Sequence, residues 1–179
     1  MPDSIGQVWL SQAASDLEAA ETLWNGGKIK PTLYCQAIAK YQQSVEKSVK
    51  AVALDMRSAK MQLRGIGPDD YQRHPASAFV TAFVRGPSAR KYPLLPGQLC
   101  KFFDQKRRGL IKALDSLVPK KSDSRNTEYP YRLPGGTLQA PAHPTSFSLK
   151  QDVEPFRQLA HEVVDFAKKI IGVIARGPK

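Results

Sequence analysis

A chain of 179 residues can bury one sizeable hydrophobic core, whereas two cores would leave each half marginal, so we expect a single domain over residues 1–179. Hydrophobic residues make up 41% and charged residues 24% of the sequence, which argues against a wholly disordered or fibrous chain. The 27 Lys and Arg residues outnumber the 16 Asp and Glu residues and give a net charge of +11. This charge favours polyanions as partners, although a solvated basic surface explains the same charge.

The first predicted helix begins at Ser4. Ser4 and Gln7 form a capping-box pattern, and apolar residues recur at helical spacing as far as Trp24. Gly26 and Gly27 then suit the left-handed turn that closes a helix. Because the next helical pattern follows after a short link, we expect the two helices to pack antiparallel.

The second predicted helix is the clearest amphipathic segment. Apolar residues from Tyr34 to Met56 lie on one stripe, and the polar residues, including Lys47 and Lys50, fall on the other side. The pattern continues to about Arg57. This spacing predicts that both lysines face solvent.

Two loop insertions, at about 58–98 and 118–149, separate the remaining helices. The first contains a short predicted helix over 76–84, closed by Gly86, and then a Pro-rich loop to residue 98. A helix from Leu99 to Leu117 follows, and it carries Arg108 and Lys112 on a basic face. The second insertion is a long Pro/Gly-rich loop, a kind of segment that is uncommon unless it is functional or mobile.

The last predicted helix begins near residues 150–152 and reaches Ile174. No segment alternates apolar and polar residues as a half-buried strand does. The predicted fold class is therefore all-α: an up-and-down bundle of four long helices plus a short one, with a long Pro/Gly-rich loop before the last helix.

The amino terminus lacks a basic stretch followed by an apolar run, and no segment has the roughly 20 apolar residues that cross a bilayer. We therefore expect a cytoplasmic protein with no membrane partner. The three His and two Cys residues lack metal-ligand spacing, and no phosphate-binding Gly-rich loop is present, so neither a metal nor a cofactor is expected.

The run from Tyr34 to Ala51 resembles the signature of HEPN domains, in which Gln-Gln, two residues, Glu-Lys, two residues and Lys-Ala follow one another. Residues 14–20 look like the first helix of that family, and residues 128–132 resemble its Tyr-Pro loop. The resemblance implies a helical bundle that commonly forms a homodimer, in proteins linked to nucleotide binding, RNA cleavage and toxin–antitoxin pairs. It also implies a nucleotidyltransferase-like protein as a candidate partner.

Catalytic members of the family carry an Arg that is followed, after four to six residues, by a His. None of the histidines here has that spacing, so the nuclease motif is absent. The nearest pair is Arg157 and His161, with three residues between them, and His74 is a further weak candidate. Arg suits phosphate oxygens and His titrates near neutral pH, but a lone His beside an apolar face is more often structural.

Several other residues are candidates for contact with nucleotide or RNA. They supply positive charge or stacking groups, and solvation or packing of a loop explains each of them equally well: Lys47, Lys50, Arg108, Lys112, Tyr129, Tyr131 and Arg132. Gln42 and Glu46 lie one helical turn apart at the edge of the apolar stripe, where we expect a structural polar contact or a dimer contact.

The sequence thus predicts a HEPN-like module that binds nucleotide or RNA and is non-catalytic or weakly catalytic, and the resemblance adds the expectation that it is one half of a two-component pair. One alternative is a metal-independent endoribonuclease that uses a non-standard Arg/His pair. Another alternative is a bundle that binds a partner protein, with its charge serving solubility.

Overall fold

The computed structural model of the chain describes residues 4–30, 33–67, 71, 75–87, 91–117, 131–132, 138–139 and 150–177, of which residues 117, 131, 132, 138, 139 and 150 are described by their backbone alone. Its elements in chain order are α1 (Ile5–Gly27), α2 (Leu33–Ser58), α3 (Ala76–Val84), α4 (Leu95–Phe102), α5 (Gln105–Leu117), β1 (Tyr131–Arg132), β2 (Leu138–Gln139) and α6 (Lys150–Ala175). The two short strands pair antiparallel, with Tyr131 opposite Gln139 and Arg132 opposite Leu138. The predicted all-α fold is confirmed.

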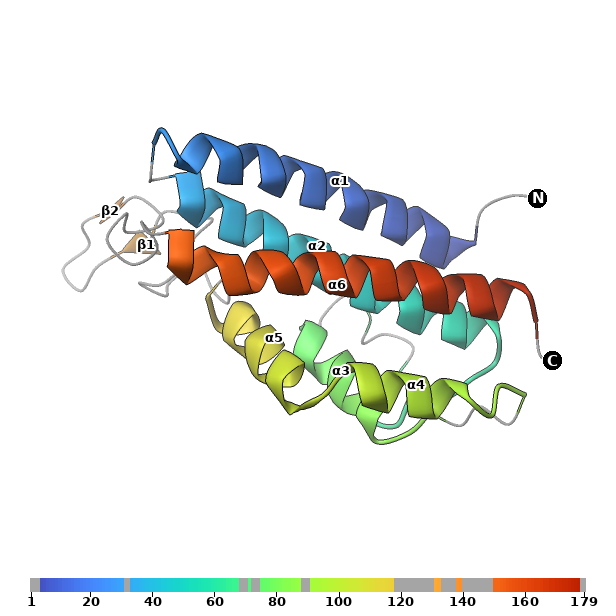
Figure 1. The fold of residues 1–179 in the computed structure, drawn as a ribbon. Coiled ribbons are helices and arrows are strands. Elements are labelled where there is room, and N and C mark those ends of the chain that lie inside the picture. The colour runs from blue at the N-terminus through green and yellow to red at the C-terminus, as the bar shows by residue number, and fades with distance from the viewer. Residues whose placement is uncertain are drawn as a thin grey trace.

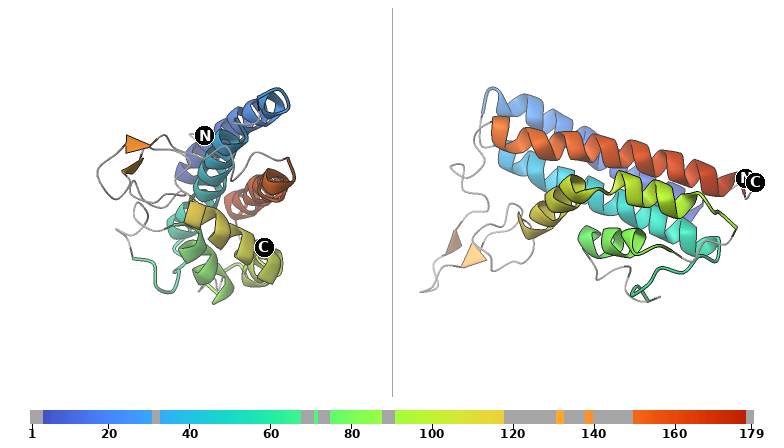
Figure 2. Two further views of the ribbon diagram at one scale, coloured as in Figure 1. Left: turned by 90° about the vertical axis from the view of Figure 1, so that its left-hand side faces the viewer. Right: turned by 60° about the horizontal axis from the view of Figure 1, so that its bottom comes forward.

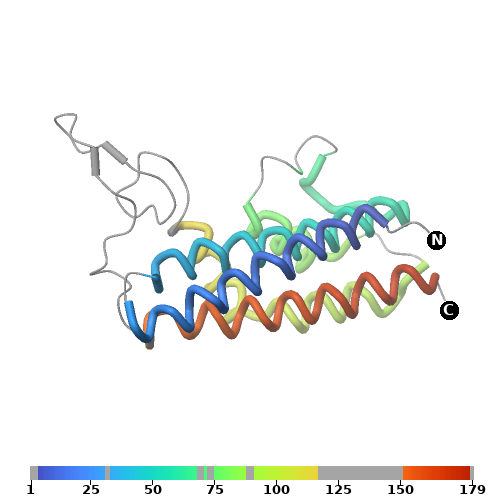
Figure 3. Tube along the Cα trace, turned by 90° about the horizontal axis from the view of Figure 1, so that it is seen from above, coloured from blue at the N-terminus to red at the C-terminus, as the bar shows by residue number. Residues whose placement is uncertain are grey.

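Three long helices, α1, α2 and α6, lie side by side, and α3, α4 and α5 pack below them (Figure 1). Helix α1 runs antiparallel to α2, as predicted, whereas α6 runs in the same direction as α2 (Figures 1 and 3). The views in Figure 2 show the three shorter helices on one side of the long ones. The arrangement brings the end of α1 beside the beginnings of α2 and α6.

The beginning of α1 is as the sequence predicts. The side chain of Ser4 accepts a hydrogen bond from the backbone N–H of Gln7 at 3.1 Å, and the side chain of Gln7 accepts from the backbone N–H of Ser4 at 2.6 Å. The helix end differs from the prediction, because Gly26 and Gly27 belong to the last helical turn and form no left-handed turn. A Cβ atom at Gly27 would lie 2.4 Å from the ring of Tyr34, so this glycine permits close packing instead.

The predicted helix from Leu99 to Leu117 is two helices. Helix α4 begins at Leu95, inside the predicted Pro-rich loop, and the chain leaves helical geometry at Phe103, whose ψ is 61°. Asp104 then accepts a hydrogen bond from the backbone N–H of Arg107 at 2.8 Å, as a residue that caps a helix does. The sequence pattern concealed this break because apolar residues keep helical spacing across it.

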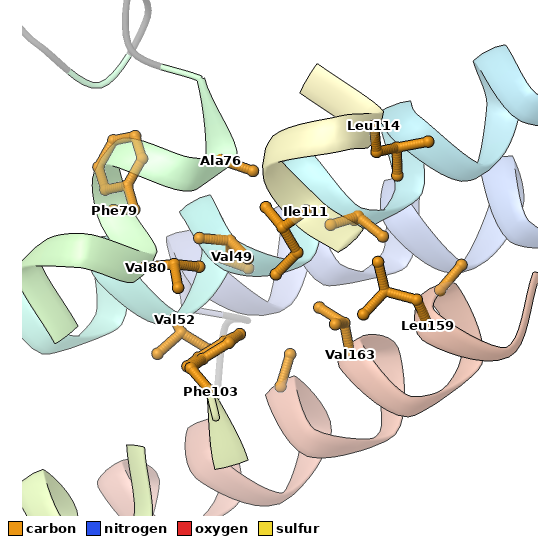
Figure 4. Packing of buried hydrophobic residues seen from close by; sticks show 14 of the residues in the cluster. Val49, Val52, Ala76, Phe79, Val80, Phe103, Ile111, Leu114, Leu159 and Val163 are labelled. Atoms are coloured by element: carbon orange, nitrogen blue, oxygen red, sulfur yellow. The ribbon is translucent and has the colours of Figure 1, made fainter. Parts of the chain in front are cut away.

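The hydrophobic core lies where α2 meets α3, α5 and α6 (Figure 4). Val49 and Val52 of α2 face Val80 of α3, and Ile111 of α5 and Leu159 of α6 close the space from the other side. All five side chains are buried. Helix α2 is thus the central element, and its predicted apolar stripe is confirmed as a core face.

Within the described ranges, no helix combines the length and apolar character needed to cross a membrane.

Candidate functional site

The carboxylate of Glu21 joins the three long helices. Its Oε1 atom accepts hydrogen bonds from the Tyr41 hydroxyl of α2 at 2.9 Å and from Nε of Arg157 on α6 at 2.9 Å. Nε2 of His161, also on α6, lies 2.9 Å from the same oxygen. Arg157 and His161 lie one turn apart on α6, so both reach a single acceptor. The structure therefore brings together the Arg/His pair that the sequence predicts.

Further contacts fix the guanidinium group of Arg157. Its Nη1 atom donates to Glu154 at 3.2 Å, and its carbon atom Cζ lies 5.3 Å from the centre of the Trp24 ring. The hydrogen bond from Arg157 to Glu21 raises the pKa of the guanidinium further above its usual value. Two carboxylates offset the charge of Arg157, so this residue is already partnered within the chain.

The environment of Glu21 and Tyr41 shifts both of their pKa values. Burial raises the pKa of Glu21, but hydrogen bonds from Arg157, His161 and Tyr41 outweigh burial, and the net pKa lies below the usual value. The pKa of Tyr41 is raised, first by burial and then by its hydrogen bond to the Glu21 carboxylate. Glu21 is therefore ionised and Tyr41 neutral at pH 7, which suits the observed hydrogen bonds.

Lys47 forms an ion pair between α2 and α1. Its Nζ atom lies 2.5 Å from Oδ2 of Asp16, and Nζ of Lys40 lies 3.1 Å from the other oxygen of the same carboxylate. The side chain of Asp16 is largely buried, whereas that of Lys47 is about one-third exposed. Lys47 thus fastens the two helices together, and a phosphate group would compete with Asp16 for it.

The prediction that Lys50 faces solvent is wrong. Lys50 is only 3% exposed, and its Nζ atom lies 2.6 Å from Oε1 of Glu46, one turn earlier on α2. The other oxygen of Glu46 accepts a hydrogen bond from Gln42 at 2.8 Å. Helix α2 contacts other helices on several sides, so the side of α2 on which Lys50 lies is also covered. Gln42 and Glu46 satisfy each other as the sequence indicates, and their predicted dimer contact stays a prediction.

Asp115 of α5 lies at the start of α3. Its Oδ2 atom accepts a hydrogen bond from the backbone N–H of Ser77 at 2.8 Å, in a helix whose own N-cap residue, Pro75, provides no capping side chain. Burial raises the pKa of Asp115, and the hydrogen bonds from Ser77 oppose that rise only partly. A carboxylate from another helix thus performs the capping that the local sequence lacks.

Exposed basic side chains gather on α5. Lys106, Arg108 and Lys112 are exposed, and none of the three forms an ion pair with another described residue. Arg107 differs, because it pairs with Asp104 at 2.7 Å and with Glu162 of α6 at 2.7 Å. Arg108 and Lys112 lie about 6 Å apart along the helix axis, on one face. The predicted basic face, with Arg108 and Lys112, is therefore present, whereas Lys106 is exposed on another side of the helix.

Four of the predicted candidates lie wholly or partly outside what the structure describes. His74 and Tyr129 fall outside the described residues. Tyr131 and Arg132 form β1, but only their backbone is described. Their predicted roles stay predictions.

Glu21, Tyr41, Asp16 and Asp115 were not singled out from the sequence. Glu21 is an acidic residue at the border of the apolar stripe of α1. This position was the only feature of the local sequence that indicated a partly buried carboxylate. Its partners on α6 are 136 and 140 residues away in sequence, so helical spacing does not identify them. Among the described residues, no group of three or more His, Cys, Asp or Glu side chains is placed to hold a metal ion.

Comparison with known proteins gives one match. Residues 7–59, which cover nearly all of α1 and α2, match the family model described as HEPN domain. No curated protein and no solved structure matches the chain. The resemblance drawn from the Tyr34 to Ala51 run is confirmed.

Proposed function

We propose that this chain, a member of the HEPN domain family by its residues 7–59, binds RNA through the exposed basic face of α5. The family supports a nucleotide- or RNA-related module in general. The observation that carries the finer proposal is the pair of exposed side chains Arg108 and Lys112, which share one face of α5 and lack acidic partners among the described residues. Their charge remains available to phosphate groups.

The other basic candidates fit this proposal less well. Lys47 is held by Asp16, Lys50 is buried beside Glu46, and Arg157 lies between two carboxylates. At each of these positions a phosphate would have to displace an acidic partner, and the lost ion pair would weaken binding. A phosphate that binds Arg108 and Lys112 on α5 displaces no such partner among the described residues. Because the face of α5 that carries Arg108 and Lys112 is exposed, these cations suit the phosphates of a nucleic-acid backbone, which binds largely by counterion release.

The test is retention of an end-labelled, single-stranded RNA in EDTA at several salt concentrations. The variant Arg108→Gln/Lys112→Gln should bind more weakly than the wild type. Its slope of log affinity against log salt should be shallower by about 1.4, at roughly 0.7 for each phosphate that the variant no longer neutralises. The variant Arg64→Gln/Lys91→Gln removes the same charge from exposed positions outside α5 and should keep the wild-type slope. Equal weakening in the two variants would contradict a site on α5.

A metal-independent ribonuclease is the second candidate function. The observation in its favour is that Arg157 and His161 share the Glu21 carboxylate, so the two side chains lie close together despite their non-standard spacing. His161 is 43% exposed at its side chain and is accessible to a substrate. The same RNA assay scores cleavage: cleavage that survives EDTA and is abolished in His161→Ala would support the enzyme, and unchanged cleavage would remove His161 from the mechanism.

The predicted homodimer and the predicted nucleotidyltransferase-like partner stay proposals. Both derive from the family and not from any described contact. Light scattering of the purified protein tests the first of them directly.

A further inference from the structure

Three donors converge on one oxygen of Glu21. The Tyr41 hydroxyl, Nε of Arg157 and Nε2 of His161 each lie 2.9 Å from Oε1, and they come from two different helices. Proteins usually bind a carboxylate or a phosphate with several neutral and charged donors that point at one oxygen from different directions. Here the oxygen belongs to the protein's own chain.

The donors are held in place by contacts other than those with Glu21. The side chain of Tyr41 is fully buried, and Arg157 is fixed by Glu154 and by the Trp24 ring. His161 lies on the same helix, four residues after Arg157, so the position of its Cα follows from α6. Loss of the Glu21 side chain would therefore leave the donors close to their present positions.

The site is also open to solvent. The side chains of Glu21, Arg157 and His161 are 24%, 32% and 43% exposed. A small anion could reach the donors without unfolding of any helix. The carboxylate of Glu21 and that of Glu154 now repel such an anion, because both lie against Arg157.

We propose that Tyr41, Arg157 and His161 form an anion cradle for an oxygen of a carboxylate or phosphate, and that Glu21 is its intramolecular occupant, which keeps external anions out. The inference does not depend on RNA binding at α5, since it concerns other residues on other helices. It makes Glu21 the residue that decides whether the Arg157–His161 pair is available to a ligand.

The experiment is rescue of a truncated side chain by an external anion. Glu21→Ala vacates the cradle and should unfold at a lower temperature than the wild type. Formate and inorganic phosphate, each added to the full chain at an ionic strength matched with chloride, should raise the unfolding temperature of Glu21→Ala saturably, because a ligand that binds the native state stabilises it. The wild type should show no such rise above chloride.

Two variants serve as controls. Glu154→Ala removes a carboxylate from Arg157 but leaves Glu21 in the cradle, so formate and phosphate should not stabilise it beyond chloride. Glu21→Ala/Arg157→Ala lacks the main charged donor and should lose the response. Formate acting without phosphate would restrict the cradle to carboxylates, and both acting would extend it to phosphate groups.

If neither anion stabilises Glu21→Ala beyond chloride, the donors do not form a cradle. If the wild type responds as strongly as Glu21→Ala, Glu21 does not exclude anions. If Glu21→Ala does not fold in chloride, recovery of its helical circular dichroism is measured instead. Recovery in formate or phosphate supports the inference, and no recovery in either anion contradicts it.

Discussion

Gly6 lies where the beginning of α1 packs closely against α2. Its backbone N–H donates to Oδ1 of Asp55 at 2.9 Å, and Oδ2 of the same carboxylate accepts from the Ser4 hydroxyl at 2.9 Å. A Cβ atom at Gly6 would lie 2.4 Å from Cγ of Asp55 and 2.7 Å from the backbone oxygen of Ala51. Glycine is therefore required here for space, and Asp55 near the end of one helix caps the beginning of another.

Gly6→Ala should lower the free energy of unfolding by about 1–3 kcal/mol, because the added methyl group forces α1 away from the Asp55 carboxylate. The matched control is Gly109→Ala in α5, where a Cβ atom meets nothing within 4 Å. That control should raise stability by about 0.5–1 kcal/mol, as alanine does in an exposed helix. Urea denaturation measures both; an unchanged midpoint for Gly6→Ala would contradict the close approach.

At the scale of the elements, polar residues join the helices as much as apolar residues do. Lys47 and Lys40 tie α2 to Asp16 of α1, and Ser44 donates to the backbone oxygen of Ala13 at 2.8 Å. The Glu21 cluster joins α1 to α6 farther along the bundle. Much of the polar sequence of α2 therefore belongs to helix packing rather than to a ligand site.

The Glu21 contact between α1 and α6 should depend on pH. Because its pKa in the folded protein is lowered, the ionised carboxylate contributes stability above the unfolded-state pKa of about 4.3, and this contribution disappears as pH falls through the folded-state pKa. The difference in unfolding free energy between the wild type and Glu21→Gln should therefore be largest near neutral pH and vanish at low pH. Denaturant titrations from pH 7 to pH 3 measure it; a constant difference would show that the charge of Glu21 is not involved.

For the whole molecule, the central position of α2 sets the distribution of stability. Helix α2 contacts α1, α3, α5 and α6, whereas α5 exposes the face that carries Arg108 and Lys112. A helix that is covered on most sides opens only with the entire core, and a helix with an exposed face can open locally. The proposed binding helix thus lies at the edge of the fold, where its charges remain accessible.

Hydrogen exchange tests this distribution. Backbone amides from Val45 to Ala53, which are buried over most of that span, should exchange more slowly than those from Arg108 to Leu114 in α5. Mass spectrometry of the native protein resolves the two segments. Slower exchange in α5 than in α2 would place the stable centre elsewhere.

The sequence by itself determined the helical class, the start of α1, and the bounds of α2 and α3, because helical periodicity and end signals such as Ser4 and Gly86 are local. It also carries the resemblance to HEPN domains that the match over residues 7–59 supports. It also located the basic face of α5. Only the tertiary structure decided which of the described cations already have acidic partners, because the partners of Lys47 and Arg157 lie 31 and 136 residues away and the burial of Lys50 depends on neighbouring helices. The break at Phe103 and the hydrogen bonds of Glu21 to α2 and α6 were also decided by the tertiary structure. Both depend on contacts between elements, and the residue pattern within one helix does not predict such contacts.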